Sequence, residues 1–241
     1  MEKYSKYSMM LFEDKSIKEE EDKMELLELE KISYINKDKY ILKDISLKIN
    51  KGDFISVVGP SGSGKSTLFK ICSHLINQSQ GEIKYKNKNV NEYDPMELRK
   101  EISYCFQTPY LFGDKVMDNI LFPYIIRNKE INRDRIKELF SLFNLSEEFL
   151  DSQVKNLSGG EKQRIALIRT LLFEPIILLL DEITSALDSE NVLLVEAVIQ
   201  ELNHKGMTIM WITHDQEQSK KYSNKILVME EGKVKNLEVL K

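Results

Sequence analysis

Cysteine is scarce in this chain, with only Cys72 and Cys105 among 241 residues. They form no C-x-x-C pair and no metal-ligand spacing, so we expect two ordinary buried thiols of a reducing compartment. Long apolar runs are also missing, because none approaches the roughly 20 residues that a membrane-spanning helix needs. The charged N-terminus has no signal-peptide pattern. We therefore expect any membrane role to depend on a partner.

Net charge and repeats are equally limited. The net charge of −4 gives no sign of a general nucleic-acid-binding surface, and no internal repeat is found. The hydrophobic content of 41% is enough for a sizeable core in one domain. Residues 1–23 are rich in Lys, Glu and Ser and predict a charged, mobile extension. A short helix using Met9, Met10, Leu11 and Phe12 is the alternative there.

One stretch, residues 59–67, fits the phosphate-binding pattern G-x-x-x-x-G-K-[ST]. An apolar strand, residues 54–58, is predicted before it, and Leu68, Ile71, Cys72, Leu75 and Ile76 recur at helical spacing after it. Glycines and free N–H groups at a helix start bind phosphate. Lys65 is expected to reach the β- and γ-phosphates, and the Ser66 hydroxyl to ligate Mg²⁺. The nucleotide-binding residues expected here are Gly59, Ser61, Gly62, Ser63, Gly64, Lys65, Ser66 and Thr67.

Strands and helices alternate along the rest of the chain, which predicts an α/β fold with a largely parallel sheet. Antiparallel-looking strands precede the phosphate loop, with Tyr34 between them. Further strands are expected at residues 81–85, 102–107, 176–181, 207–213 and 226–229. A helix is expected at residues 189–205, with Leu193, Leu194, Ala197, Val198 and Leu202 on its apolar face. Residues from 108 to about 165 predict a mostly helical insertion.

Polar residues follow several of these core strands, at the edge where α/β sheets bind ligands. Asp181 and Glu182 end one strand, so Asp181 is expected to hold Mg²⁺ through water and Glu182 to act as general base. Gln107 ends another strand and is expected near Mg²⁺ or the attacking water. His214 ends a third strand and is expected to donate to the γ-phosphate.

A second anion site is predicted at the start of a later helix. Ser158, Gly159 and Gly160 offer a hydroxyl, free N–H groups and no obstructing side chains. Ser158 suits an N-cap, and Glu161 occupies the capping-box position. If both anion sites bind one nucleotide, the second is expected to come from another molecule.

These motifs occur in the order found in a known family, and the chain resembles the ATP-binding subunit of an ABC transporter over about residues 24 to 235. The resemblance implies a P-loop NTPase (RecA-like) core, an N-terminal antiparallel β subdomain and a helical insertion subdomain. It implies ATP and Mg²⁺ as ligands, and a head-to-tail dimer that sandwiches two ATPs. It also implies a membrane permease as partner and a place at the cytoplasmic face of the membrane. Tyr34 then falls at the adenine-stacking position and Asp188 in the loop that signals between sites.

A narrower resemblance is to the FetA-type ATPases of bacterial iron export. It rests on residues 103–114, Asp118, Asn119, Phe122, Pro123 and residues 180–188. It implies iron as cargo. We also expect the aromatic segment of the insertion, Tyr110, Phe112, Phe122 and Tyr124, to be the surface that contacts the permease. The alternative for each of them is that it fills the core of the helical insertion.

Two functions of other classes compete with this interpretation. A soluble ABC ATPase acting on nucleic acid or ribosomes usually has two cassettes, coiled-coil insertions or a zinc hook, and this chain has none of them. A stand-alone phosphate-loop kinase would leave residues 157–161 unexplained. A transporter ATPase for another solute stays open, since the permease chooses the substrate.

Overall fold

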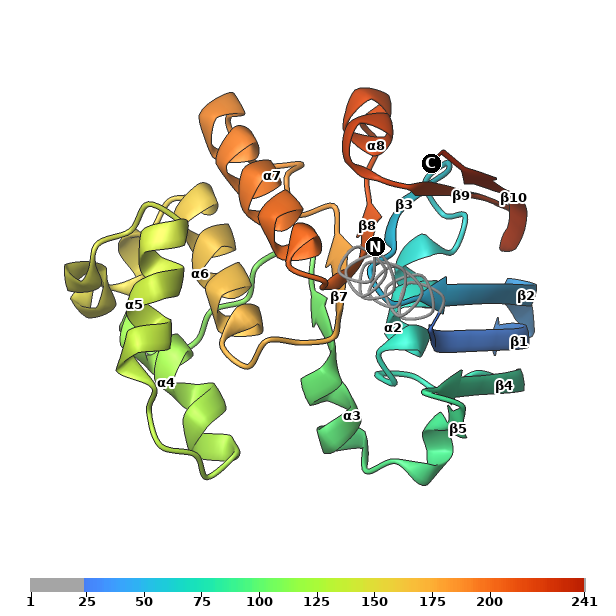
Figure 1. The fold of residues 1–241 in the computed structure, drawn as a ribbon, viewed down its shortest axis with the longest axis horizontal. Coiled ribbons are helices and arrows are strands. Elements are labelled where there is room, and N and C mark those ends of the chain that lie inside the picture. Colours follow the sequence, from blue (N-terminus) through green and yellow to red (C-terminus); the bar gives the residue numbers. More distant parts are fainter. Residues whose placement is uncertain (1–23, 241) are drawn as a thin grey trace, which may run out of the picture.

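The computed structural model describes residues 24–240. The predicted extension, residues 1–23, lies outside the described residues. Two sheets organise the described part (Figure 1). The first has the strand order β2-β1-β4-β5 and the second the order β10-β9-β3-β8-β7-β6.

The first sheet is antiparallel. Its strands are β1 (Glu25–Asn36), β2 (Lys39–Asn50), β4 (Gln80–Tyr85) and β5 (Lys88–Asn89). A tight turn joins β1 to β2, because Lys37 and Asp38 both have positive φ, 47° and 62°. Two such residues make the hairpin turn whose twist matches that of the strands. Tyr34 lies within β1, opposite Leu42 of β2. The sequence interpretation that placed it between the strands is therefore wrong.

The second sheet has a parallel centre and one antiparallel edge strand. Its strands are β3 (Phe54–Val58), β6 (Ile102–Cys105), β7 (Ile177–Asp181), β8 (Thr208–Ile212), β9 (Lys225–Glu230) and β10 (Lys233–Val239). Every residue of β7 and β8 is buried, as expected for central parallel strands. The α/β fold with a largely parallel sheet is confirmed.

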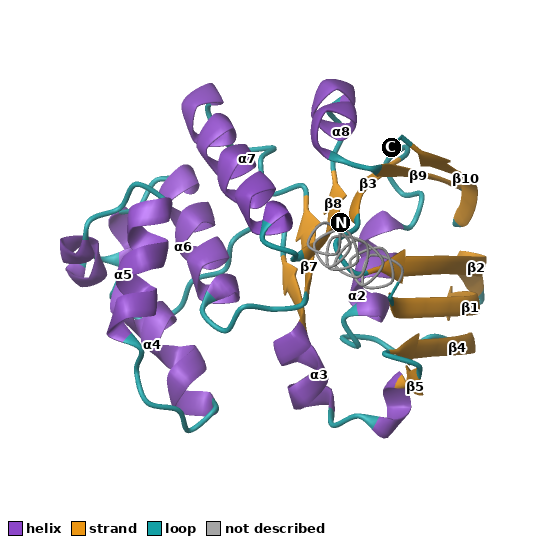
Figure 2. Ribbon diagram, in the orientation of Figure 1, coloured by secondary structure: helices purple, strands orange, loops and turns teal. Residues whose placement is uncertain are grey.

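Helices cover both faces of the second sheet (Figures 1 and 2). They are α2 (Lys65–Cys72), α3 (Pro95–Glu101), α4 (Val116–Ile126), α5 (Arg133–Leu142), α6 (Gly159–Leu171), α7 (Ser189–His204) and α8 (Gln216–Tyr222). Short 3₁₀ turns occur at Val90–Glu92, Glu147–Asp151 and Val154–Asn156. None of the helices within residues 24–240 has the length and apolar character needed to span a bilayer.

Side-chain alternation along β7 divides the interior into two cores. Ile177 and Leu179 pack with α2 and the first sheet. Leu178 and Leu180 pack with the helices α4 to α7. Because α2 and α6 belong to different cores, they lie on opposite faces of the sheet.

Helix α2 is shorter than the sequence predicted. It ends at Cys72, and His74 has a positive φ of 52°. The amide of Leu75 bonds to the carbonyl of Lys70, and that of His74 to Ile71. These are the two bonds of a Schellman motif, which stops a helix. Leu75 is consequently 42% exposed.

The apolar face predicted for α7 is also partly wrong. Leu193 is 60% exposed and Ala197 is exposed, whereas Val195 and Ile199 are buried. The helix is apolar on several sides, so periodicity alone allowed more than one face. The helix is rotated so that Glu196 is buried. The Glu196 carboxylate accepts hydrogen bonds there from Gln218 and Tyr222 of α8.

Candidate functional site

The candidate site lies at the C-terminal ends of neighbouring parallel strands. The phosphate loop, residues 59–67, follows β3, and Glu182 follows β7. Gln107 follows β6, and His214 follows β8. The strand order β3-β8-β7-β6 brings these ends side by side. This is the edge at which α/β sheets bind their ligands.

At two positions of the phosphate loop there is no room for a side chain, so glycine is required. A Cβ on Gly59 would lie 2.1 Å from the carbonyl oxygen of Met229, and one on Gly64 would lie 2.6 Å from Leu42 Cδ2. Gly64 also has a φ of 98°, where side chains are strained. The loop is thus packed closely against β9 and β2 at these two positions.

The start of α2 presents an anion-binding environment. Gly64 provides no side-chain cap, and the first turn contains no acidic residue. The first N–H groups of the helix are therefore available, and the helix dipole favours negative charge there. The Ser63 hydroxyl is buried without a protein partner. Ser61 and Gly62 are exposed, and Ser66 and Thr67 are half-buried.

Lys65 lies within the loop. Its ammonium donates to the carbonyl oxygens of Gly59, at 2.8 Å, and Pro60, at 3.0 Å. Burial lowers the pKa of Lys65, and the charges of Glu182 and Asp181 oppose that shift. An anion entering the loop would supply a charged acceptor in place of the two carbonyls.

The structure brings Glu182, Gln107 and His214 together. The Gln107 amide donates to Glu182 Oε2 at 2.7 Å, and His214 Nε2 lies 2.7 Å from Glu182 Oε1. An ionised carboxylate only accepts, so Nε2–H of His214 is the donor. Sequence reasoning placed all three at strand ends but did not predict that the carboxylate would be bound on both sides.

The backbone at Glu182 is unusual for a residue with a side chain. Its φ is 47°, and its amide donates to the carbonyl of Ile212 at 3.1 Å. Left-handed backbone costs about 1–2 kcal/mol at such a residue. Strained backbone of this kind is concentrated at functional sites. Here it turns the carboxylate from the end of β7 toward Gln107 and His214.

Asp181 is held differently from Glu182. It is 4% exposed, and its Oδ2 accepts a hydrogen bond of 2.6 Å from the Tyr104 hydroxyl. Its Oδ1 has no protein partner. Sequence reasoning missed Tyr104, because no motif marks a tyrosine whose hydroxyl crosses from one strand to the next.

These residues fit a magnesium ion bound together with a nucleotide. Residues 24–240 contain no cluster of three or more His, Cys, Asp or Glu side chains able to hold a metal. Mg²⁺ usually needs only one or two carboxylates when phosphates supply other ligands. The unpartnered oxygen of buried Asp181 and the Ser66 hydroxyl are oxygen ligands of that kind. The amide of Gln107 lies at the same edge.

The second predicted anion site begins α6. Ser158 Oγ accepts from the Glu161 amide at 3.3 Å, and the Ser158 amide donates to Glu161 Oε2 at 2.7 Å. This reciprocal pair is the predicted capping box. A Cβ on Gly159 would meet nothing within 4 Å, so nothing inside this chain requires glycine there. Because α2 and α6 lie on opposite sheet faces, Ser158 is not part of the phosphate loop of its own chain.

Two further predicted residues have defined local roles. Asp188 caps α7 and accepts from the backbone and side-chain amides of Asn191 at 2.9 and 2.7 Å. These bonds, the backbone one first, lower the pKa of the Asp188 carboxyl. Tyr34 is half-buried and packs against the core beside the first sheet.

Both cysteines are buried, and burial raises the pKa of each thiol to about 12, as expected for inert thiols.

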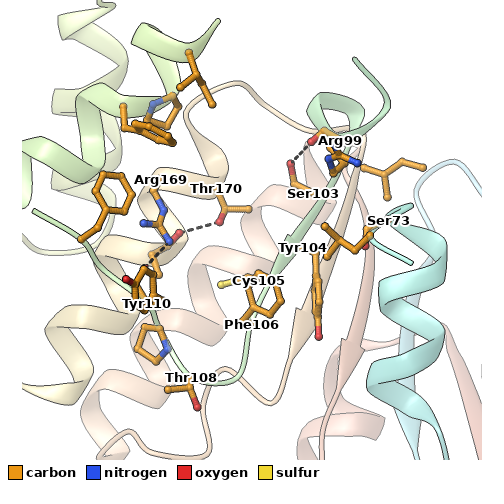
Figure 3. A pocket seen from close by; sticks show the side chains of 18 of the residues that line it. Ser73, Arg99, Ser103, Tyr104, Cys105, Phe106, Thr108, Tyr110, Arg169 and Thr170 are labelled. Atoms are coloured by element: carbon orange, nitrogen blue, oxygen red, sulfur yellow. Dashed lines mark hydrogen bonds between the residues drawn. The ribbon is translucent and has the colours of Figure 1, made fainter. Parts of the chain in front are cut away.

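A groove of about 380 Å³ lies beside the site, between β6 and α4 (Figure 3). Its lining includes Tyr104, Tyr110, Phe112, Phe122 and Ile126. Tyr110 is 76% exposed and Phe122 40% exposed.

Tyr124, the fourth aromatic of the predicted contact surface, is buried and packs on Phe173. Its assignment to an exposed surface is therefore wrong. Tyr124 sits in α4 on the side that faces the helical core.

Comparisons with known proteins give a consistent result. Residues 42–185 match the sequence profile of the family described as "ABC transporter". The chain is 40% identical over 206 residues to the probable iron export ATP-binding protein FetA of Escherichia coli (strain K12), covering 85% of this chain and 91% of that protein. It is 37% identical over 213 residues to the spermidine/putrescine import ATP-binding protein PotA of Borrelia garinii, covering 86% of this chain and 60% of that protein.

A solved structure resembles the whole fold. It is the dimeric post-hydrolysis state of the ATP-binding cassette MJ0796 bound to ADP and Pi, with a TM-score of 0.81 and 30% identity. The match covers 90% of this chain and 99% of that one.

Proposed function

The chain belongs to the ABC transporter family as an ATP-hydrolysing subunit that energises a transporter, and we propose that the solute it serves is iron, moved out of the cell. The observation that supports iron is the 40% identity to FetA over 85% of this chain and 91% of that protein. The match to a polyamine importer makes another solute the second candidate.

When ATP binds, the Lys65 ammonium exchanges its hydrogen-bond acceptors. The β- and γ-phosphate oxygens replace the carbonyls of Gly59 and Pro60 as acceptors of the ammonium. The gain is electrostatic, because a neutral acceptor is replaced by a charged one. The free N–H groups at the start of α2 bind the same phosphates, and Tyr34 stacks on the adenine.

Hydrolysis then depends on Glu182. His214 leaves Glu182 Oε1 and donates to the γ-phosphate, which frees one carboxylate oxygen for a water molecule. Glu182 removes a proton from that water as the water oxygen bonds to the γ-phosphorus, and the bond from the γ-phosphorus to the bridging oxygen breaks, so that ADP leaves with that oxygen. Gln107 stays beside the water and orients it through its amide. The hydrogen bonds that Glu182 already makes on both sides support this division of roles.

Ser66, Asp181 and Gln107 are the residues that would hold Mg²⁺. When bound, the ion would neutralise charge that develops on the phosphate oxygens.

A complete site takes residues from two chains. Gly159 and Gly160 offer backbone N–H groups at the start of α6, and a Cβ on Gly159 would meet nothing within 4 Å, but α6 and α2 lie on opposite faces of the sheet. In a head-to-tail dimer they would close on the γ-phosphate bound by the partner. Asp188 caps the helix that packs against Gly160 through Asn191, so it lies beside this contact. The dimeric state of the MJ0796 cassette supports the arrangement.

The groove between β6 and α4 is the proposed contact with a membrane permease. Arg169 donates to the Tyr110 carbonyl at 2.9 Å and to Asn119 Oδ1 at 3.0 Å. Asn119 in turn bonds the backbone of Phe112 in both directions. These bonds fix the backbone at Tyr110 and Phe112 before a partner binds, which suits a short helix of the permease. The chain would thus sit at the cytoplasmic face of the membrane through its partner.

Deleting the gene tests the choice of solute. If iron is exported, cellular iron and sensitivity to peroxide rise in the deletion strain. The wild-type gene reverses both effects, and the Glu182→Gln variant reverses neither. Unaltered iron with altered export or uptake of another solute, spermidine included, would reject iron and leave the ATPase assignment intact.

A further inference from the structure

Tyr104 belongs to both the groove and the hydrolysis site. Its side chain lines the groove between β6 and α4 (Figure 3). Its hydroxyl donates to Asp181 Oδ2 at 2.6 Å. One side chain thus touches the proposed permease contact and the carboxylate proposed to hold the metal.

The ring of Tyr104 is packed on two sides. Phe106, which also lines the groove, lies with its ring centroid 4.4 Å away. Phe69 of α2 meets the ring edge-on at 6.2 Å. A shift of Phe106 by a bound partner would therefore press on Tyr104, and Tyr104 would move against the phosphate-loop helix and Asp181.

The hydroxyl determines how Asp181 is oriented. Asp181 is almost fully buried, and this phenol is the hydrogen-bond partner of Oδ2. Oδ1 is buried and has no protein partner.

We propose that Tyr104 is a positioning residue that fixes the Asp181 carboxylate for metal binding and links its orientation to occupancy of the groove. This inference rests on the proposed function, in which Asp181 holds Mg²⁺ and the groove binds the permease. The link is separate from Gln107, whose amide contacts Glu182. Gln107 lies in the chain between Phe106 and Thr108, which line the groove, whereas Tyr104 lines the groove itself.

Tyr104→Phe tests the first half, because it removes the hydroxyl and keeps the ring. The probe is Mn²⁺ together with a non-hydrolysable ATP analogue, and the readout is the Mn²⁺ dissociation constant from the electron paramagnetic resonance of free Mn²⁺. We expect affinity to fall by about 10-fold or more, the scale for losing a group that orients a metal-binding carboxylate. Analogue affinity without metal stays unchanged.

Tyr85→Phe is the matched control. The Tyr85 hydroxyl also donates to a carboxylate, Glu101 Oε2, at 2.6 Å, but lies in the first sheet. The Tyr85→Phe substitution should leave the Mn²⁺ affinity unaltered. Equal Mn²⁺ affinity in wild type and Tyr104→Phe, or an equal loss in both variants, would overturn the role of Tyr104. A wild-type chain that binds neither the analogue nor Mn²⁺ would instead overturn the proposed function.

A groove-filling label tests the second half. Ile126 lies across the groove on α4 and is 47% exposed, so Ile126→Cys accepts a bulky maleimide while the buried native thiols do not. The label should change Mn²⁺ affinity at least about fivefold relative to the unlabelled variant. Adding Tyr104→Phe should abolish that change. No change on labelling, or the same change without the hydroxyl, would refute the link.

Discussion

Glu182→Gln separates the chemistry of the site from its stability. The substitution keeps the shape of the side chain but replaces one acceptor oxygen by an NH₂ group. Gln107 keeps an acceptor if the remaining oxygen faces it, and His214 can accept from the new NH₂ in its other neutral tautomer. The chain therefore loses charge assistance at two bonds. Since the His214 side chain is 53% exposed, we expect a loss of less than about 1 kcal/mol in the free energy of unfolding.

The expected loss of activity is much larger. Removing a general base lowers turnover by roughly 10²–10⁴-fold, which corresponds to about 3–5 kcal/mol in the activation barrier. Because ATP binding uses Lys65 and the start of α2, nucleotide affinity should change little. The variant should consequently accumulate with ATP bound and as a dimer.

Single-turnover hydrolysis of bound ATP and chemical denaturation measure the two effects. Glu231→Gln is a matched control, because Glu231 is also a glutamate with positive φ, 49°, but is exposed at the β9–β10 turn. It should leave both quantities unchanged. Turnover of Glu182→Gln within about threefold of wild type would show that Glu182 is not the base.

Three other substitutions test the surrounding structure. Lys65→Ala should weaken ATP binding by at least about tenfold, measured by calorimetry, since it removes a charged donor; unchanged affinity would refute the phosphate-loop assignment. Gly59→Ala should lower the free energy of unfolding by about 1–3 kcal/mol through the clash with Met229, more than Gly159→Ala, whose Cβ has open space and whose backbone is not left-handed. Equal losses would contradict the packing argument. Phe112→Ala should preserve ATP hydrolysis by the isolated chain but reduce its recovery with the permease from membranes; a chain that no longer folds would show that Phe112 serves the core.

The sequence predicted the strands well, because their signal is local. Residues 54–58 and 177–181 are short apolar runs bounded by turn or polar residues, and the structure places β3 and β7 there. The capping box at Ser158 and Glu161 was equally visible, since the two residues recognise each other within one turn of helix.

Errors arose where the answer depended on contacts between distant residues. Helix α2 ends because His74 adopts a left-handed backbone. Glycine is the usual residue at such a position, so a histidine there gives no signal of a helix end in the sequence. The burial of Tyr124 depends on Phe173, and the rotation of α7 fits bonds from α8 to Glu196. Periodicity within one segment contains none of this information.

The site shows the same limit. Parallel strands bring their C-terminal ends to one edge, so Glu182, Gln107 and His214 could be expected to gather there. Their hydrogen-bonded arrangement requires the strand order β8-β7-β6 and the left-handed backbone of Glu182. The Tyr104–Asp181 bond depends on the same neighbouring strands, β6 and β7.

The shared ATP site is tested most directly by one crosslink. Ser61 in the phosphate loop and Ser158 before α6 are both exposed, and the native thiols are buried. One chain carrying Ser61→Cys is mixed with another carrying Ser158→Cys in the Glu182→Gln background, and disulfide formation is measured with and without ATP. The head-to-tail site predicts a disulfide between the two chains that forms with ATP and not without it. Absence of that disulfide with ATP bound, or its equal formation without ATP, would contradict it.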